Sequence, residues 1–147
     1  METSSPKLGL SAEEVGNLTA GGAAFELAVV DPDPNVRTQL AMQLGEVTEV
    51  ATYPEIAALV ERLRPGQPAV VVFGPGFSDH AGLAQIEAVS RARPELGAIL
   101  VVEELTTGLL QQALRSGVRD VLSDPVGPEG LQESVERVGR ALARRPA

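Results

Sequence analysis

Apolar and polar positions follow two alternating patterns along most of the chain. Short runs of apolar, largely β-branched residues are typical of buried strands, and each is followed by a segment in which apolar residues recur every three or four positions, as on one face of a helix. Such pairs follow one another from Phe25 to Ala143. The predicted strands span residues 25–30, 47–51, 69–73, 98–102 and 118–122.

The predicted helices begin after turns that contain proline or glycine and end near Gly or Pro, which punctuate helices. Gly117, which closes the fourth helix, is expected to adopt a left-handed conformation. The apolar residues that define the five helix faces are Val36, Leu40 and Leu44; Ile56, Leu59, Val60 and Leu63; Leu83, Ile86 and Val89; Leu109, Leu110, Ala113 and Leu114; and Leu131, Val135, Val138 and Leu142.

Strands that alternate with helices predict an α/β domain of the flavodoxin-like (βα)5 type. Parallel strands need crossover connections, and right-handed crossovers place helices on both faces of a doubly wound sheet. Five strands favour the order 2-1-3-4-5. Function in such sheets lies at the carboxyl ends of the strands, near the switch point between the first and third strands.

The polar segment before Phe25 is expected to be a flexible leader. Its one periodic feature is Leu10, Val15 and Leu18, behind a capping box of Ser11 and Glu14. The chain ends in Arg-Arg-Pro-Ala directly after the fifth predicted helix, as a linker to a further domain would begin. We therefore expect a leader over 1–24, a folded domain over 25–143, and the start of a linker over 144–147.

Composition narrows the function classes. The absence of cysteine excludes disulfides, thiol nucleophiles and cysteine-based metal sites, and the single histidine, His80, excludes a histidine cluster. A net charge of −8 opposes binding to nucleic acid and to anionic lipid. No segment reaches the ~20 apolar residues of a membrane span, and the N-terminus lacks a signal-peptide pattern. We expect a cytoplasmic protein with no cofactor and no direct membrane insertion.

Gly74-Pro75-Gly76 ends the third predicted strand, where a glycine loop is able to bind phosphate through its backbone N–H groups. The loop lacks the Lys-Ser/Thr ending of a P-loop, and Pro75 contributes no N–H group. We interpret it as a plain turn and keep phosphate binding as the alternative.

Four acidic residues follow the predicted strands: Asp31, Asp33, Glu103 and Asp124. Two carboxylates about 4 Å apart repel by ~4 kcal/mol at an effective dielectric constant near 20. A bound divalent cation, protonation of one carboxyl group, or side chains turned out into solvent would each relieve that repulsion. We favour outward side chains, and keep Asp31 and Asp33 as the candidate metal ligands.

From Phe25 to Ala143 the chain resembles a response-regulator receiver domain. VVDPDPNVR resembles the opening strand and acidic turn of a receiver, and PAVVVFGPGF resembles the strand and loop that carry its phosphoacceptor. SGVRDVLSDPV resembles the segment Gly-Ala-Asp-Asp-Tyr-Leu-Thr-Lys-Pro-Phe. The resemblance implies a pocket for Mg²⁺ and a phosphoryl group at the ends of the strands.

The residues at the first half of that pocket depart from the receiver pattern. Asp31 keeps the first position of the acidic pair that holds Mg²⁺, but Pro32 stands at the second, and Asp33 follows one residue later. Gly74 stands where a receiver has its phosphoacceptor aspartate. Because glycine has no side chain, no acyl phosphate is able to form at this position.

The second half of the pocket departs as well. Val102 or Glu103 replaces the hydroxyl residue after the fourth strand, and Asp124 replaces the lysine that binds the phosphoryl group. Only Pro125 matches, and in the family the peptide bond before it is commonly cis. The sequence therefore predicts an atypical receiver that works without phosphorylation.

Signalling receivers often pair through the face formed by the fourth helix, the fifth strand and the fifth helix, and this chain keeps charge there. Complementary charges across a two-fold axis set the register of a dimer. We expect a homodimer with an Asp120–Arg137 contact between chains. The candidate interface residues are Arg115, Arg119, Asp120, Glu133, Arg137 and Arg140.

A degenerate receiver behind a polar leader resembles the N-terminal domain of TadZ/CpaE-type pilus-assembly proteins. The resemblance implies a further MinD/ParA-like ATPase domain, partners in the secretion machinery of Flp (Tad) pili, and a place at the cell pole, at the inner face of the membrane. We expect a non-enzymatic interaction and localisation module. The alternative is a degenerate signalling receiver that responds to metal or phosphate, or that regulates a DNA-binding domain.

Overall fold

The computed structural model describes residues 25–45 and 50–143, which form a parallel sheet in the order β2-β1-β3-β4-β5. This is the predicted flavodoxin-like order. The strands are β1 (Glu26–Val30), β2 (Ala51–Tyr53), β3 (Ala69–Phe73), β4 (Leu96–Val102) and β5 (Val118–Ser123). The helices are α2 (Pro34–Leu44), α3 (Ile56–Arg62), α4 (His80–Ala92), α5 (Thr107–Arg115) and α6 (Pro128–Ala143), with a short 3-10 helix, η1 (Pro75–Phe77), after β3.

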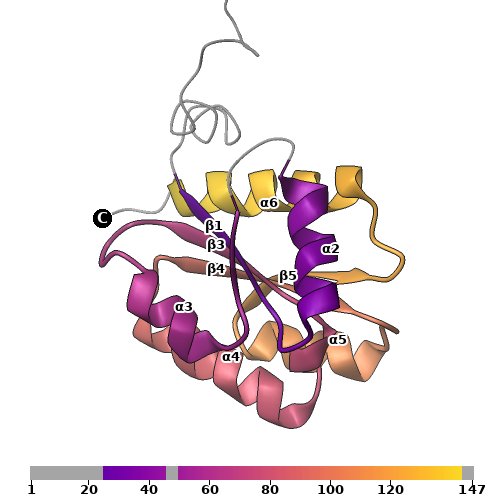
Figure 1. Ribbon diagram of the computed structural model, residues 1–147. Helices are drawn as coiled ribbons and strands as arrows, with labels where there is room; N and C mark the ends of the chain where they lie inside the picture. Colours follow the sequence, from indigo (N-terminus) through magenta and orange to yellow (C-terminus); the bar gives the residue numbers. More distant parts are fainter. Residues whose placement is uncertain (1–24, 46–49, 144–147) are drawn as a thin grey trace, which may run out of the picture.

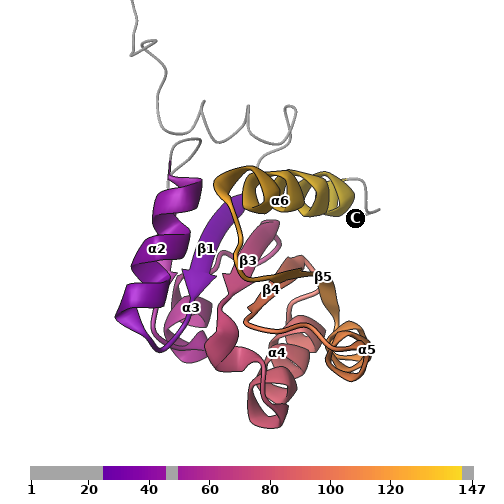
Figure 2. The same ribbon diagram turned by 90° about the vertical axis from the view of Figure 1, so that its right-hand side faces the viewer.

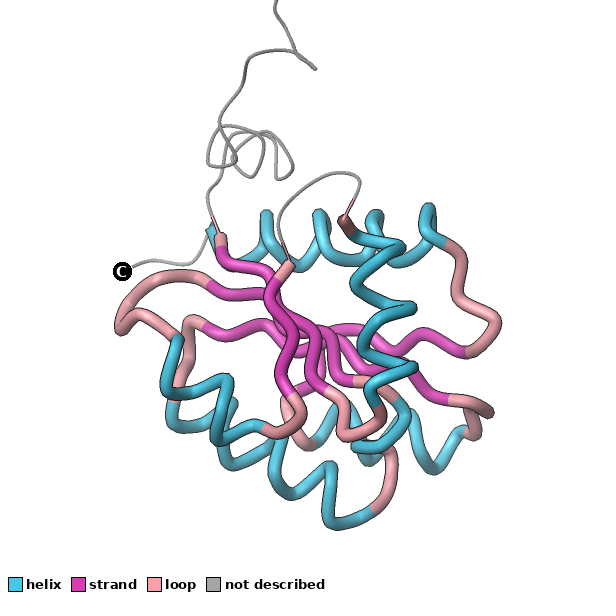
Figure 3. Tube along the Cα trace, viewed as in Figure 1, coloured by secondary structure: helices cyan, strands magenta, loops and turns pink. Residues whose placement is uncertain are grey.

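Helices cover both faces of the sheet (Figures 1 and 3). α2 and α6 lie on one face, and α3, α4 and α5 lie on the other, as the turned view makes plain (Figure 2). Each face has its own apolar cluster, built largely from valine and leucine. β3 and β4 are buried along their whole length, which explains why their sequences are continuous apolar runs rather than alternating ones.

Most predicted element boundaries agree with the structure to within about two residues. β4 begins at Leu96, earlier than predicted, and includes Gly97, where a Cβ would lie 2.6 Å from Val138 Cγ1 on α6. Gly117 has a φ of 95°, which confirms the left-handed residue after α5. β2 occupies Ala51–Tyr53 rather than residues 47–51, and residues 46–49 lie outside the described part.

The predicted leader (1–24) and the predicted start of a linker (144–147) also lie outside the described residues, and both stay predictions. Within the part of the chain that is described, no helix combines the length and the apolar character that a membrane span requires.

Candidate functional site

The carboxyl ends of β1, β3, β4 and β5 lie at one edge of the sheet. In a receiver domain, the pocket for Mg²⁺ and the phosphoryl group lies at the corresponding edge. Backbone hydrogen bonds fix the loops there in pairs. Gly74 N donates to Val30 O at 3.0 Å, so Gly74 lies beside Asp31 at the end of β1. Asp124 N donates to Val102 O at 2.8 Å, which joins the ends of β4 and β5 in the same way.

Asp31 directs its side chain into the protein rather than toward solvent, and the residue is only 1% exposed. Its Oδ1 accepts a hydrogen bond from Asp33 N at 2.8 Å, and its Oδ2 accepts one from Gly76 N at 2.9 Å. Such charge-assisted bonds compensate a buried carboxylate for the water it has lost. The predicted outward side chain is therefore wrong for Asp31.

The Asp31 carboxylate fills the space in front of Gly74. A Cβ at position 74 would lie 2.3 Å from Asp31 Oδ2 and 2.9 Å from its Cγ, closer than a side chain tolerates. The backbone of Gly74 is extended, with φ −80° and ψ −179°, so the conformation does not itself require glycine. The close approach of Asp31 requires it. While Asp31 keeps this conformation, the position at which a receiver carries its phosphoacceptor has no room for a side chain.

Gly76 is tightly enclosed in the same way, because a Cβ there would lie 2.7 Å from Pro32 Cδ. The N–H groups of the loop are already occupied. Gly76 N is bound to Asp31, Phe77 N donates to Gly74 O at 3.0 Å, and Ser78 N donates to Pro75 O at 3.0 Å. With Gly74 N bound to β1 and no N–H on Pro75, residues 74–78 have no free N–H group for a phosphate. The loop is therefore a turn whose N–H groups are all bonded within the protein, in agreement with the plain turn interpreted from the sequence.

Asp33 and Arg37 hold the other side of the pocket. Asp33 caps α2, because its Oδ1 accepts a hydrogen bond from Asn35 N at 2.9 Å. Arg37 Nη1 donates to the carbonyl oxygens of Asp31 at 2.8 Å and Pro32 at 3.2 Å. The sequence reasoning did not single out Arg37. Its place one helical turn after the Asp-Pro-Asp-Pro turn is the signal that would have identified it.

The remaining pocket residues do not converge on Asp31. Val102 is fully buried in the core, whereas Glu103 and Asp124 are exposed. The Asp124–Pro125 peptide bond is cis, as the receiver resemblance implies. Within the described residues, no group of three or more histidine, cysteine or acidic side chains is arranged to hold a metal ion. The residues present therefore do not fit the Mg²⁺ of a receiver, since the oxygen atoms of Asp31 serve backbone N–H groups instead.

The candidate interface residues lie on and around β5. Asp120 on β5 and Arg137 on α6 do contact one another, but within one chain. Asp120 Oδ2 also accepts a hydrogen bond from Ser134 Oγ at 2.6 Å. The proposed contact between chains thus involves two residues that are already paired in the single chain. Ser134, 1% exposed, was missed by the sequence reasoning, although a serine on the apolar face of α6 is a signal of a buried hydrogen bond.

The other four candidate interface residues present their charge to solvent. Arg115, Arg119, Glu133 and Arg140 are all exposed, and no ion pair is formed by any of them among the described residues. Leu114 on α5 lies beside Arg115 in sequence and is 51% exposed. β5 is also an edge strand of the sheet. This face of α5, β5 and α6 is therefore exposed to solvent in the described part of the single chain.

Comparison with known proteins places this domain among receiver-like folds. A scan against protein-family models gives no match, and a search of curated proteins gives none either. Among solved structures, a CpaE pilus assembly protein from Burkholderia thailandensis has 28% sequence identity and a TM-score of 0.68, covering 78% of this chain and 97% of that one. A pilus assembly-related protein from Burkholderia pseudomallei has 27% identity and a TM-score of 0.70, covering 83% and 94%.

A CheY-like receiver domain from Methanospirillum hungatei has 18% identity and a TM-score of 0.68, covering 82% of this chain and 97% of that one. At this identity the likeness concerns the fold alone. The chain is thus a receiver-like domain that resembles the CpaE-type pilus assembly proteins, as the sequence predicted.

Proposed function

We propose that this chain is a non-enzymatic interaction and localisation module of a pilus-assembly apparatus. One observation carries the proposal. The Asp31 carboxylate closes the phosphoacceptor position at Gly74 and is held there by the N–H groups of Asp33 and Gly76. Because this pocket is filled by the protein's own residues, it is not expected to be phosphorylated. The domain would then act through contacts that its surface makes with other proteins or domains.

The likeness to CpaE-type structures supports the cellular setting. In this proposal the domain positions a MinD/ParA-like ATPase domain that follows it, contacts the secretion machinery of the pilus, and works in the cytoplasm at the cell pole. Receiver-like neighbours are also found as parts of larger chains. For example, this chain aligns with 51% of the length of a two-component response regulator that carries a GGDEF domain. This fold therefore occurs with a covalently attached second domain.

The face of α5, β5 and α6 is the proposed self-association surface. It combines an edge strand, an apolar side chain at Leu114, and the exposed charges of Arg115 and Arg119. Interfaces typically place an apolar contact at the centre and charge at the rim. A two-fold arrangement would bring the same surface of each copy together.

Sedimentation equilibrium of the 147-residue chain tests this proposal. We expect a dimer whose dissociation constant is unchanged by Mg²⁺ and by a small-molecule phosphodonor. Leu114→Glu should weaken the dimer, because it places a charge at the centre of the contact. Ala84→Glu is the matched control, since Ala84 is exposed on α4 and lies outside this face.

Three results would argue against the proposal. A monomer at all concentrations would assign the assembly role to another domain or partner. A dimer that forms only with the phosphodonor would show that the pocket still responds to phosphorylation, and would favour the alternative of a signalling receiver with an output domain. Equal dissociation constants for Leu114→Glu and Ala84→Glu would place the contact on another face.

A further inference from the structure

Charge is distributed unevenly between the two edges of the sheet. At the carboxyl edge, acidic residues stand in the loops that lead from a strand to the next helix: Asp33, Glu55, Asp79, Glu103, Glu104 and Asp124. At the amino edge, arginines stand where α3, α4 and α5 end and the next strands begin: Arg62, Arg64, Arg91, Arg93, Arg115 and Arg119. A chain with a net charge of −8 thus has one edge that is rich in arginine.

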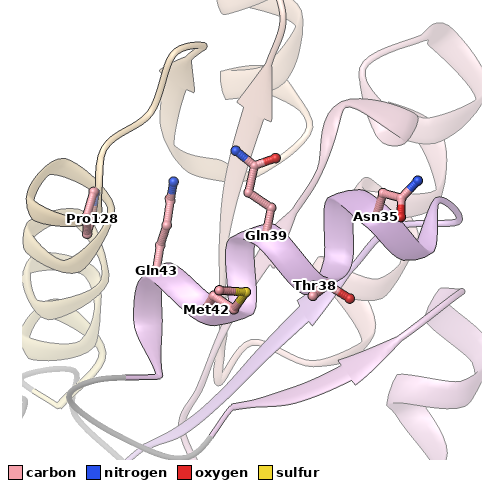
Figure 4. A pocket seen from close by; sticks show the side chains of 6 residues that line it. All are labelled: Asn35, Thr38, Gln39, Met42, Gln43 and Pro128. Carbon is pink, nitrogen blue, oxygen red and sulfur yellow. The ribbon is translucent and has the colours of Figure 1, made fainter.

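A groove of about 300 Å³ opens at the amino edge, between the C-terminal ends of α4 and α5. The turned view shows these two helices side by side (Figure 2). Arg91 and Pro94 line the groove on the α4 side, and Arg115, Gly117 and Arg119 line it on the α5 side. The groove along α2, by contrast, has no charged side chain in its lining (Figure 4), which consists of Asn35, Thr38, Gln39, Met42, Gln43 and Pro128. The groove between α4 and α5 thus combines a hollow with positive charge.

Two of the three arginines that line this groove have no acidic partner among the described residues. Arg91 Nη2 lies 2.8 Å from Glu87 Oε2, which also lines the groove, so this pair is neutral. Arg115 and Arg119 are exposed, and neither forms an ion pair within the described part of the chain. Arg115 complements the dipole of α5 from its last turn, but Arg119 lies on β5 and has no such role. Because guanidinium groups bind carboxylates in a planar, bidentate geometry, the groove offers a site for two carboxylates.

We propose that this groove binds residues 103–105 of a second copy of the chain. These residues form the loop after β4, and every residue from 103 to 108 is exposed. Glu103 and Glu104 form no ion pair among the described residues, and they supply two carboxylates for the two unpaired arginines. Leu105, 38% exposed, supplies an apolar side chain that packs against Pro94. The loop therefore matches the groove in the sign of its charge and in the number of charged groups.

The contact forms between copies, because one chain is unable to make it with itself. The loop follows the last residue of β4, whereas Leu96, the first residue of β4, lines the groove. The length of β4 separates the two by about 20 Å, at ~3.3 Å per residue. The net charge of −8 does not prevent the contact, because charges further apart than the Debye length of about 8 Å are largely screened at physiological salt.

Such a contact is heterologous, since two different surfaces meet. Each added copy leaves one loop and one groove free, so copies are able to form a row in which all have the same orientation. The two-fold contact proposed above would instead use the same surface of both copies and stop at a pair. The inference goes beyond that contact and does not depend on it, although both involve Arg115 and Arg119. A loop in a groove buries less than the ~800 Å² per partner of a stable interface, so the contact acts where copies are concentrated.

Paramagnetic relaxation in mixed samples tests the contact, and the absence of cysteine from the chain allows a label at one engineered site. A chain at natural isotope abundance carries a nitroxide at Thr107→Cys, an exposed position beside the loop. It is mixed with ¹⁵N-labelled native chain, so that only contacts between copies broaden the signals. We expect the amide signals of Ser116 and Gly117 to broaden. Glu103→Gln with Glu104→Gln in the nitroxide chain should reduce that broadening several-fold, and so should a higher salt concentration.

Two controls separate this contact from the alternatives. Glu55→Gln with Glu61→Gln in the nitroxide chain makes the same change of charge at the two ends of α3, away from the loop, and should leave the broadening unchanged. Leu114→Ser in both copies removes the apolar centre of the two-fold contact and should also leave the broadening unchanged. Circular dichroism verifies that each variant keeps its fold.

Three results would overturn the proposal. The first is the absence of broadening at Ser116 and Gly117. The second is equal broadening with the variant of the loop, at Glu103 and Glu104, and with the control variant on α3. The third is a loss of broadening with Leu114→Ser, since it would assign the contact between copies to the two-fold dimer.

Discussion

The carboxylate of Asp31 lies where a side chain at Gly74 would have to be, with Oδ2 2.3 Å from the position of a Cβ. The two residues therefore depend on one another. Glycine at position 74 makes room for Asp31 to turn inward, and Asp31 in that position holds the N–H group of Gly76. Glycine at the phosphoacceptor position and the inward-turned Asp31 are therefore structurally coupled, because each conformation requires the other.

This relationship predicts that Gly74→Ala is destabilising. The added methyl group must displace a buried carboxylate, and overpacking of this kind costs about 1–3 kcal/mol. The free energy of unfolding, measured with urea, should fall by that amount. Gly108→Ala is the control, because Gly108 lies inside α5, where a Cβ meets nothing within 4 Å, and it should be neutral or slightly stabilising. Equal effects of both substitutions would contradict the close approach of Asp31.

The hydrogen bonds of Asp31 predict a loss of stability in Asp31→Asn. Asparagine has one carbonyl oxygen, so it keeps one of the two N–H donors and directs its own NH₂ group at the other. We expect a cost of about 1–3 kcal/mol in urea denaturation. Asp33→Asn is the matched control and should be close to neutral, because asparagine caps a helix as well as aspartate does.

Asp31→Asn also tests whether the pocket binds a metal ion. If both oxygen atoms of Asp31 serve backbone N–H groups, Mg²⁺ should leave the thermal unfolding midpoint of the native chain unchanged. A saturable rise in that midpoint, present in the native chain and absent in Asp31→Asn, would show that Asp31 binds the ion after all.

The close packing of η1 on α4 predicts a further glycine effect. At Gly82, the third residue of α4, a Cβ would lie 2.5 Å from both Cα and O of Phe77. Because these are backbone atoms, the loop that carries Gly74 and Gly76 would have to move. Gly82→Ala should cost about 1–3 kcal/mol of unfolding free energy. Gly130, the third residue of α6, has open space around it, and Gly130→Ala should be neutral or stabilise by about 0.5–1 kcal/mol. A cost at Gly130 equal to that at Gly82 would contradict the packing argument.

Much of the fold could be predicted from sequence because its signals are local. Continuous apolar runs mark β3 and β4, and the helix periodicity between them needs no knowledge of the rest of the chain. The start of β2 could not be placed as well, since Ala51 and Thr52 are exposed at the sheet edge and their pattern carries little information.

The candidate site could be predicted in position but not in conformation. The sequence placed Asp31 and Gly74 at adjacent strand ends. The inward turn of Asp31, however, depends on Gly76, which lies 45 residues away in sequence. Likewise, charge pattern identified Asp120 and Arg137 as partners. Only the packing of α6 on β5 shows that they meet within one chain.

The Asp120–Arg137 contact permits a last prediction that separates a pair within one chain from a pair between chains. Asp120→Arg places two arginines side by side and removes the acceptor of the buried Ser134 hydroxyl, which should cost about 1–3 kcal/mol. Adding Arg137→Asp restores the attraction between opposite charges at positions 120 and 137. It does not restore the hydrogen bond that the Ser134 hydroxyl donates to Asp120 in the native chain. The side chains of Arg137 and Asp120 are 57% and 25% exposed, so the double variant should regain only about 0.2–1 kcal/mol.

Ser134→Ala provides the comparison, because it removes the serine bond and keeps the charge pair. For a pair within one chain, the gain of the double variant should appear in urea denaturation and be independent of protein concentration. If the double variant instead restores association in sedimentation equilibrium while its unfolding free energy equals that of Asp120→Arg, the two residues pair between chains. The intramolecular contact would then be secondary to the interface predicted from sequence.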